Sequence, residues 1–347
     1  MKPVLIAIVK DEEKNIIRCL ESVSHLFDRF VINYSGTTDK TVEVGSEWMS
    51  ENGKSGLWIE PEWKGAGDAL NHCIEKAAEL GEWCLRIDAD MVGEGTLPEI
   101  LKLDSDITAI DIGIHRMDGS FISNRPFCFR IRDSKYRGVR HEGLWTTKRM
   151  NQTDFKYYHH DDSGARPRDA STYTDDYMAM WNELPSQIDD DLVQRYAFYM
   201  ANSARDAGDL FTAAVWYRVR QLMGGYEEEV SISMREHALI LNEPDFFIKA
   251  LAKNPERADT VWWALAVRTQ FGGAYTATVC SIVQPDKWKY DLMFQPNEAL
   301  WNAGYQMIIA LTELGRFDEA KKLAGRVRDF QGADLDALSS AIPGWDD

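Results

Sequence analysis

The sequence predicts an α/β domain with a mostly parallel, Rossmann-like sheet, followed by an all-α domain of helical hairpins. Up to about residue 165, short apolar runs alternate with amphipathic stretches, which is typical of βαβ units. Beyond that point strand-like runs nearly vanish and long helical stretches take over. We therefore predict the α/β domain in 1–165, a linker in 166–192 and the helical domain in 193–347.

Composition and charge narrow the class of protein. The 347 residues are 44% hydrophobic and 27% charged, which is typical of a soluble globular protein. No apolar run approaches the ~20 residues needed to span a bilayer, and the opening MKPVLIAIVK reads as a strand rather than a signal peptide. Five scattered cysteines favour a reducing cytoplasm. The net charge of -17 argues against a general nucleic-acid binder.

The first domain is predicted from strands and helices that alternate along the chain. The expected strands are VLIAIV (4–9), RFVINY (29–34), GLWIEP (56–61) and EWCLRI (82–87). The expected helices lie in 11–23, after 35–41 and in 68–81, with Asp11 and Thr38 as N-caps of the first two. Ligands of such sheets bind beyond the carboxyl ends of the strands. Three polar clusters follow strands there, in 10–13, 35–41 and 88–90.

The segment LRIDADM (85–91) ends an apolar run with two carboxylates. In a strand, residues two apart share a face, so Asp88 and Asp90 can converge on one point. Two neighbouring carboxylates repel each other unless a cation, a proton or a hydrogen-bonded group lies between them. A turn or a helix cap is the plain alternative. The chemical interpretation is a Mg²⁺ or Mn²⁺ site that shares a phosphate-bearing substrate.

The second half contains at least three predicted helical hairpins. They lie in 195–225, 259–283 and 297–329, with turns at Gly208, Gly272 and Gly315. Large aromatic residues before the turn and alanines after it suit antiparallel packing. We predict a tetratricopeptide-like stack, whose concave surface is suited to a binding groove or a homodimer contact.

Four segments together resemble family 2 glycosyltransferases of the GT-A fold. They are VLIAIVKDEEKNIIRCLESV, SGTTDKT, ALNHCIEKAAELGEWCLRIDADM and YRGVRHEGLW, in that order. The likeness is narrower to bacterial and phage members with a tetratricopeptide-like tail. It implies an enzyme that moves a sugar from a nucleoside diphosphate sugar, with UDP as the expected nucleotide, and uses a divalent metal.

The resemblance also implies roles for individual residues. Asp90 would bind the metal directly, and Asp88 would contact the ribose or a metal-bound water. Asp39 matches an acidic residue near the nucleoside, although an Asp at a helix N-terminus is favoured anyway. The donor-binding residues are expected to be Ile8, Lys10, Glu12, Tyr34, Asp39, Lys64, Asn71 and Asp88.

One position departs from the family pattern. Tyr34 stands at the end of the second strand, where the family carries an Asp that reads the uracil ring. A Tyr can stack or donate one hydrogen bond, but it does not replace a carboxylate. Lys10 and Lys64 are candidate phosphate contacts, and a solvated surface lysine is the alternative for each.

The segment RGVRHEGLW (137–145) supplies the candidate catalytic groups. An acceptor loses its proton as it attacks, so we predict Glu142 as the general base and His141 as the residue that orients it. A salt-bridged Glu and a packed His are the alternative. Within YYHHDD (157–162), His159 or His160 could complete the metal site, with His159 preferred. Asp161 and Asp162 are the substitutes if Glu142 is not the base.

Two other classes stay open from the sequence. A zinc hydrolase could use His141, His159, His160 and Asp90, but it leaves the first half unexplained. A helical scaffold with a degenerate transferase domain is the second alternative, supported by Tyr34 alone. The acceptor could be a peptide or protein, a glycan or a modified phage DNA base. We expect inversion at the sugar carbon, with a retaining outcome as the alternative.

Overall fold

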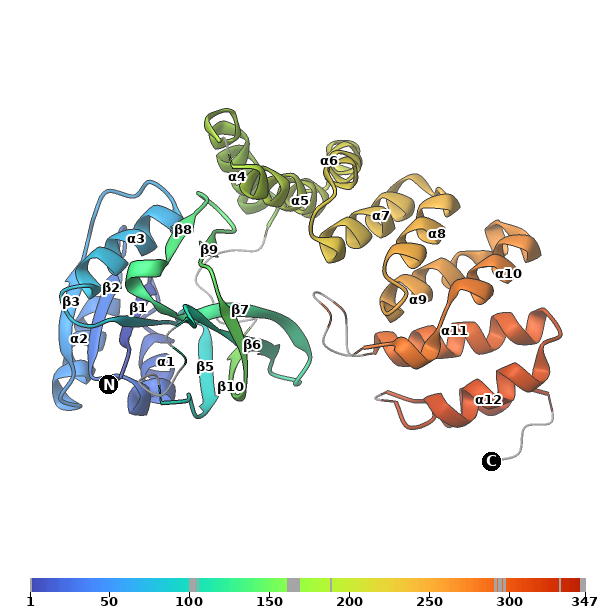
Figure 1. The fold of residues 1–347 in the computed structure, drawn as a ribbon, viewed down its shortest axis with the longest axis horizontal. Coiled ribbons are helices and arrows are strands. Elements are labelled where there is room, and N and C mark those ends of the chain that lie inside the picture. Colours follow the sequence, from blue (N-terminus) through green and yellow to red (C-terminus); the bar gives the residue numbers. More distant parts are fainter. Residues whose placement is uncertain are drawn as a thin grey trace. The chain divides into compact units, whose positions relative to one another are not determined.

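The computed structural model describes residues 2–99, 104, 106–160, 169–187, 189–289, 292, 295, 298–330 and 332–343. The chain divides into two compact units, Met1–Leu192 and Val193–Asp347 (Figure 1). The first is an α/β unit and the second is built from helices.

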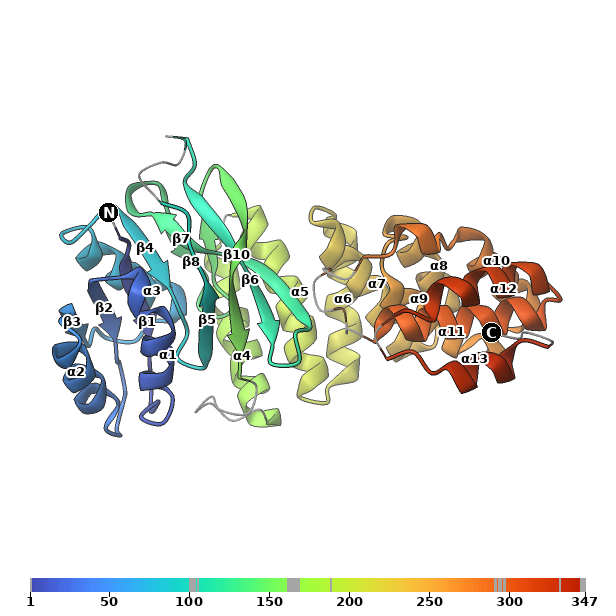
Figure 2. The ribbon, with the colours of Figure 1, turned by 90° about the horizontal axis from the view of Figure 1, so that it is seen from below.

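The first unit contains an eight-stranded sheet in the order β3-β2-β1-β4-β7-β6-β10-β5 (Figure 2). Its strands are β1 Val4–Ile8, β2 Arg29–Asn33, β3 Ser55–Ile59, β4 Trp83–Arg86, β5 Met91–Gly95, β6 Ala109–Arg116, β7 Phe121–Arg130 and β10 Arg149–His159. The first four are parallel, as predicted. β7 runs antiparallel to both β4 and β6, whereas β10 is parallel to β6 and antiparallel to β5.

Alternating side chains of β1 fill two cores on opposite faces of the sheet. Leu5 and Ala7 belong to the core that includes helices α1 (Ile16–Val23) and α2 (Thr41–Glu51). Val4 and Ile6 pack in the core of α3 (Ala66–Ala77) on the other face. Because both faces are covered, the strand is apolar at every position, and this produced the unbroken run VLIAIV.

The segment predicted as a linker contains a helix. Residues 169–187 include α4, Ala170–Glu183, which begins where the side chain of Asp169 accepts a hydrogen bond from Thr172 N. This helix belongs to the first unit, Met1–Leu192. A two-stranded sheet, β8 Lys135–Arg137 with β9 Gly143–Trp145, completes the unit.

The second unit is built from α-helices. The helices are α5 Asp190–Asp206, which crosses the unit boundary, α6 Leu210–Met223, α7 Glu227–Leu241, α8 Pro244–Lys253, α9 Ala258–Ala266, α10 Gly272–Ile282, α11 Ala299–Glu313, α12 Phe317–Val327 and α13 Leu335–Ala341. Short 3-10 turns lie at Ser24–Leu26, Ile131–Asp133, Leu184–Ser186, Arg268–Gln270 and Pro285–Lys287. Neighbouring helices pack as pairs, including α6 with α7 and α11 with α12. Gly208 and Gly315 lie in turns as predicted, whereas Gly272 is the first residue of α10.

No helix in the described parts of the chain is long and apolar enough to cross a membrane. All five cysteines are buried and free of disulfides. Burial raises the pKa of the Cys73 thiol to about 12, so this thiol is neutral at physiological pH.

Candidate active site

The candidate residues gather where parallel strands end. Ile8 pairs with Asn33 across β1 and β2, and Ile6 pairs with Arg86 across β1 and β4, so the three strands end at one edge. The loops that follow them contain the predicted clusters, including Tyr34 after β2 and Asp88 after β4.

Asp88 and Asp90 lie in the turn between β4 and β5 rather than on a strand. Met91 N donates to the carbonyl of Asp88 at 3.0 Å and closes the turn. His159, the last residue of β10, pairs with Met91 of β5. This register brings His159 Nε2 to 3.1 Å from Asp90 Oδ2, with both side chains partly accessible to solvent. His159, the histidine preferred for the metal site, thus contacts Asp90, the predicted metal ligand. The backbone N–H of His160 donates a hydrogen bond to the carbonyl of Asp90.

Asp88 has a different partner. Its Oδ1 accepts from Nε and Nη2 of Arg86 at 3.2 and 3.1 Å. In the described residues, no group of three or more His, Cys, Asp and Glu side chains is arranged to hold a metal ion. Within the predicted set, Asp88 therefore pairs with Arg86, whereas Asp90 lies beside His159. The same finding leaves a zinc hydrolase without a preformed site in this part of the chain.

Glu142 is the second carboxylate on Arg86. Its Oε1 lies 2.7 Å from Arg86 Nη2, and only 10% of its side chain is exposed. Burial by itself raises the pKa of Glu142, but the charges of Arg86 and Arg125 together with a backbone hydrogen bond outweigh it and lower the pKa below the usual value. Glu142 is therefore an ionised, buried group beside the turn of Asp88.

The loop that carries Glu142 is held by the N-terminus of α3. Ala66 N donates to the carbonyl of Val139 and Gly67 N to that of Gly138, each at 3.1 Å. These are first-turn N–H groups that the helix itself leaves without an acceptor. A Cβ at Gly67 would lie 2.6 Å from the carbonyl oxygen of Gly138, so the approach requires glycine.

Helix α4 also holds this loop. Val139 N donates to Glu183 Oε2 at 3.0 Å, and Arg140 Nε donates to Asp176 Oδ1 at 2.7 Å. The next residue, His141, adopts a left-handed backbone with φ 49°, which is uncommon for a residue other than glycine. The supposed linker thus fixes the segment that presents Glu142.

The loops after β1 and β2 are locked by two aspartates. Asp11 Oδ1 accepts from Thr38 N at 2.7 Å and from Asp39 N at 3.2 Å, which lowers the pKa of Asp11. In return, Asp39 Oδ2 accepts from Glu13 N at 3.0 Å. Our prediction that Asp11 and Thr38 cap helices was wrong, because both side chains join loop to loop and α1 begins only at Ile16.

The other residues predicted to bind the donor differ in their exposure and contacts. Tyr34 packs edge-on against Trp58, with ring centroids 6.5 Å apart. Lys10 is exposed, and Glu12 accepts from Asn15 Nδ2 at 2.7 Å. Lys64 forms an exposed ion pair with Glu62 at 3.2 Å, which matches the surface-lysine alternative.

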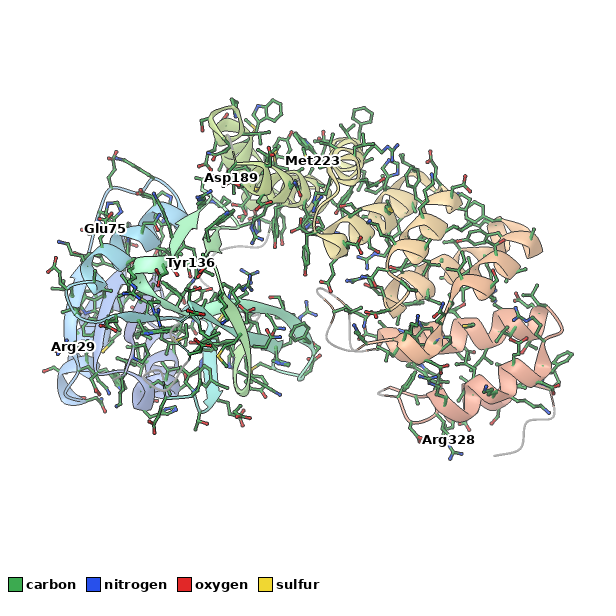
Figure 3. All side chains as sticks on the ribbon, viewed as in Figure 1. Arg29, Glu75, Tyr136, Asp189, Met223 and Arg328 are labelled. Atoms are coloured by element: carbon green, nitrogen blue, oxygen red, sulfur yellow. The ribbon has the colours of Figure 1, made fainter. Side chains whose placement is uncertain are left out.

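Asn71 has a scaffolding contact. Its amide donates to the carbonyl of Tyr136 and accepts from Tyr136 N, both at 2.9 Å (Tyr136 is labelled in Figure 3). This pair attaches α3 to β8, so the geometry gives no support to a donor-binding role for Asn71. Asp161 and Asp162, the substitutes for Glu142, lie outside the described residues.

Sequence reasoning missed Arg86, Asp176 and Glu183. A signal existed for Arg86, since an arginine inside the apolar run WCLRI needs a buried partner. None existed for Asp176 or Glu183, because each reaches a loop that is distant in the sequence.

Comparison with known proteins assigns the first unit. Residues 4–165 match the sequence model of a family described as glycosyl transferase family 2. Residues 4–165 form a family 2 glycosyl transferase domain. The family 2 resemblance predicted from four short segments is confirmed for this part of the chain. No curated protein matches the chain.

The solved structures that resemble this chain have low sequence identity to it. The crystal structure of S. aureus TarS is 14% identical with a TM-score of 0.41, covering 74% of this chain and 55% of that one. Residues 1–349 of TarS with UDP-GlcNAc are 14% identical with a TM-score of 0.36, covering 91% and 92%. Glucosyl-3-phosphoglycerate synthase from Mycobacterium tuberculosis, with Mn²⁺, UDP-glucose and phosphoglyceric acid, is 20% identical with a TM-score of 0.25, covering 33% and 44%. Similarity at this level does not indicate the substrate of this chain.

Proposed function

We propose that the protein transfers a sugar from a UDP sugar to a hydroxyl acceptor. The observation that carries the proposal is the attachment of Asp88 and Glu142 to one buried arginine at the carboxyl edge of the sheet of a family 2 domain. Asp88 follows the strand beyond which such sheets bind ligands. Glu142 is ionised and can accept a proton from an attacking hydroxyl.

Asp90 and His159 are the residues that would hold a Mn²⁺ or Mg²⁺ ion directly, and Asp88, which stays on Arg86, would contact the ribose or a metal-bound water. A carboxylate and an imidazole already meet at 3.1 Å, and an imidazole in the donor set suits Mn²⁺ better than Mg²⁺. When bound, such an ion neutralises the negative charge that develops on the leaving diphosphate. The protein's own part is to bring Asp90 and His159 together and to hold Asp88 on Arg86.

Glu142 supports an inverting reaction. A single displacement needs one base on the acceptor side and no enzyme nucleophile. Hydrogen bonds from α3 and α4 hold the loop of Glu142, and Arg86 and Arg125 keep the pKa of Glu142 low. We infer that it takes the proton of the acceptor hydroxyl as the bond to the sugar carbon forms and the bond to the diphosphate oxygen breaks.

We further propose that the helical unit is a tetratricopeptide-like stack in a cytoplasmic enzyme, and that it binds the acceptor or a second copy of the chain. Repeat stacks of helix pairs expose extended surfaces of this kind. A peptide, a glycan and a hydroxymethylated DNA base are the acceptor classes to test.

The test begins with binding and ends with turnover. We expect UDP, UDP-GlcNAc and UDP-glucose to raise the melting temperature of the full chain with Mn²⁺ or Mg²⁺, and to lose that effect in excess chelator. ADP serves as the matched nucleotide control. UDP release is then measured with each acceptor class. If no uridine nucleotide stabilises the chain, the donor assignment is wrong, and equal stabilisation in chelator removes the metal.

A further inference from the structure

Arg86 occupies an unusual position for a charged side chain. It is the last residue of β4 and only 6% exposed, and its guanidinium carbon lies 4.9 Å from the ring centroid of Phe127 and 5.2 Å from that of Tyr136. Its polar contacts lead to two carboxylates, at 3.1 Å for Asp88 and 2.7 Å for Glu142. Two aromatic rings and two carboxylates therefore hold the guanidinium in place.

Stability alone does not explain this arginine. Two charges taken out of water cost desolvation free energy that their attraction only partly offsets, and apolar replacements of buried pairs are often as stable. Both partners of Arg86 are instead residues of the candidate active site, from segments that are distant in sequence. A planar guanidinium can bind two carboxylates in fixed directions, which an ammonium group does less well.

We propose that Arg86 is a positioning residue of the transfer reaction, holding Asp88 on the donor side and Glu142 on the acceptor side in one fixed arrangement. The inference rests on the proposed function. Its effect is on orientation, because a base displaced by a fraction of an ångström from its acceptor loses much of its rate advantage. Arg86 also keeps Glu142 charged in a buried environment, so the base is ready before the acceptor arrives.

Two variants and a control separate this role from simple packing. Arg86→Met keeps a long side chain against Phe127 and Tyr136 without charge, and Arg86→Lys keeps the charge without the fork. Arg149→Met is the matched control, because Arg149 binds Asp111 at 2.9 Å at the opposite end of β10 from His159. Each is measured in the full chain as UDP release from UDP-GlcNAc and UDP-glucose with Mn²⁺, water being the acceptor, and as the Kd of UDP.

We expect Arg86→Met to lower turnover by ~10²-fold and Arg86→Lys by about tenfold, with a smaller change in the Kd of UDP. Arg149→Met should leave turnover unchanged. In the Glu142→Gln background, Arg86→Met should lower turnover by less than about threefold further, because the group it positions has already lost its basicity.

The pH profile supplies a readout that packing alone would not move. Glu142 faces Arg86 of β4, Arg125 of β7 and Tyr136 of β8. Without Arg86, burial raises the pKa of Glu142, so the acidic limb of the turnover profile should move to higher pH in Arg86→Met and stay in place in Arg149→Met.

The outcomes are distinguishable. The inference is overturned if the loss of turnover in the double variant equals the product of the losses in Arg86→Met and Glu142→Gln and the acidic limb of the pH profile does not move in Arg86→Met. Arg86 would then be a packing residue. If Arg86→Met does not fold, Arg86→Lys carries the same comparison. A wild-type chain that binds no UDP sugar with Mn²⁺ or Mg²⁺ refutes the proposed function and the positioning role with it, whereas an active wild type with multiplicative variants refutes the positioning role alone.

Discussion

Nε2 of His159 lies 3.1 Å from Oδ2 of Asp90, where the end of β10 meets the turn that follows β4. The contact depends on register, since a slip of one residue in the pairing of β10 with β5 would point the imidazole to the other face. A histidine and a carboxylate from different strands thus meet on the site edge of the sheet.

His159→Ala should therefore weaken the binding of Mn²⁺ more than the binding of Mg²⁺. We expect the affinity for Mn²⁺ in the presence of UDP to fall roughly tenfold or more, because loss of the imidazole leaves a harder oxygen donor set. Calorimetric titration of each ion measures it. His72→Ala is the control, since His72 faces Asp68 at 3.4 Å on α3. An equal loss for both ions would remove His159 from the metal site.

Because Glu142 stays ionised between pH 5 and 7, its titration should not change turnover in this range. Its folded pKa is below the ordinary glutamate value of ~4.3, so the carboxylate is ionised above that value, and its contribution to stability is lost only as the pH falls through the folded pKa. Initial rates at saturating donor and metal measure this. Glu142→Gln should lower turnover by ~10²-fold or more at every pH with UDP binding intact. An acidic limb above pH 5 that disappears in Glu142→Gln would contradict the prediction.

The strand ends of the site could be predicted from the sequence, because apolar runs covered on both faces are conspicuous and polar clusters follow them. The contact of Arg86 with Glu142 could not. This contact joins the end of β4 to the loop before β9. Nothing in a single sequence indicates that two segments so far apart lie side by side.

Helix α4 was missed for a local reason. In Ala170–Glu183 the buried side chains are Asp176 and Met180, so the apolar stripe that reveals a helix is almost absent. Its contacts with the loop of Glu142 are polar. Likewise Asp11 looked like a helix cap, because an aspartate before an amphipathic stretch is the usual signal, yet its carboxylate binds the loop after β2.

The polar contacts of α4 predict an effect on turnover. Asp176→Asn removes the charge that holds Arg140, so we expect faster hydrogen exchange in 138–142 and a several-fold loss of turnover, with the Kd of UDP unchanged. Asp175→Asn, at an exposed position of the same helix, is the control. If UDP binding falls as much as turnover, α4 supports the donor side instead.

Asp39 should contribute more to donor binding than its loop contact explains. Asp11→Ala and Asp39→Ala both break the lock between the loops after β1 and β2. If Asp39 also binds the nucleoside, Asp39→Ala weakens UDP about tenfold more than Asp11→Ala does. Titration with UDP at fixed Mn²⁺ makes the comparison. Equal losses would assign Asp39 to the loop lock alone.

The last prediction concerns the core of the helical unit, where Asp259 is 1% exposed. Arg257 Nη2 donates to its carboxylate at 2.7 Å, and Arg235 of α7 forms a second ion pair with it. Burial alone raises the pKa of Asp259, but the two arginines lower it, so its stabilisation is present above the unfolded pKa and is lost as the pH falls through the folded value.

Asp259→Asn should therefore lower the free energy of unfolding by about 3–5 kcal/mol near neutral pH, because it removes the negative charge that two buried guanidinium groups share. Urea denaturation of the full chain, followed by circular dichroism, measures the loss. Asp286→Asn is the matched control, since Asp286 also pairs with an arginine, Arg326, but is 88% exposed, where an ion pair contributes little. Should the two variants lose equal stability, burial is not what gives the Asp259 cluster its strength, and the contact of α7 with the start of α9 must depend on apolar packing instead.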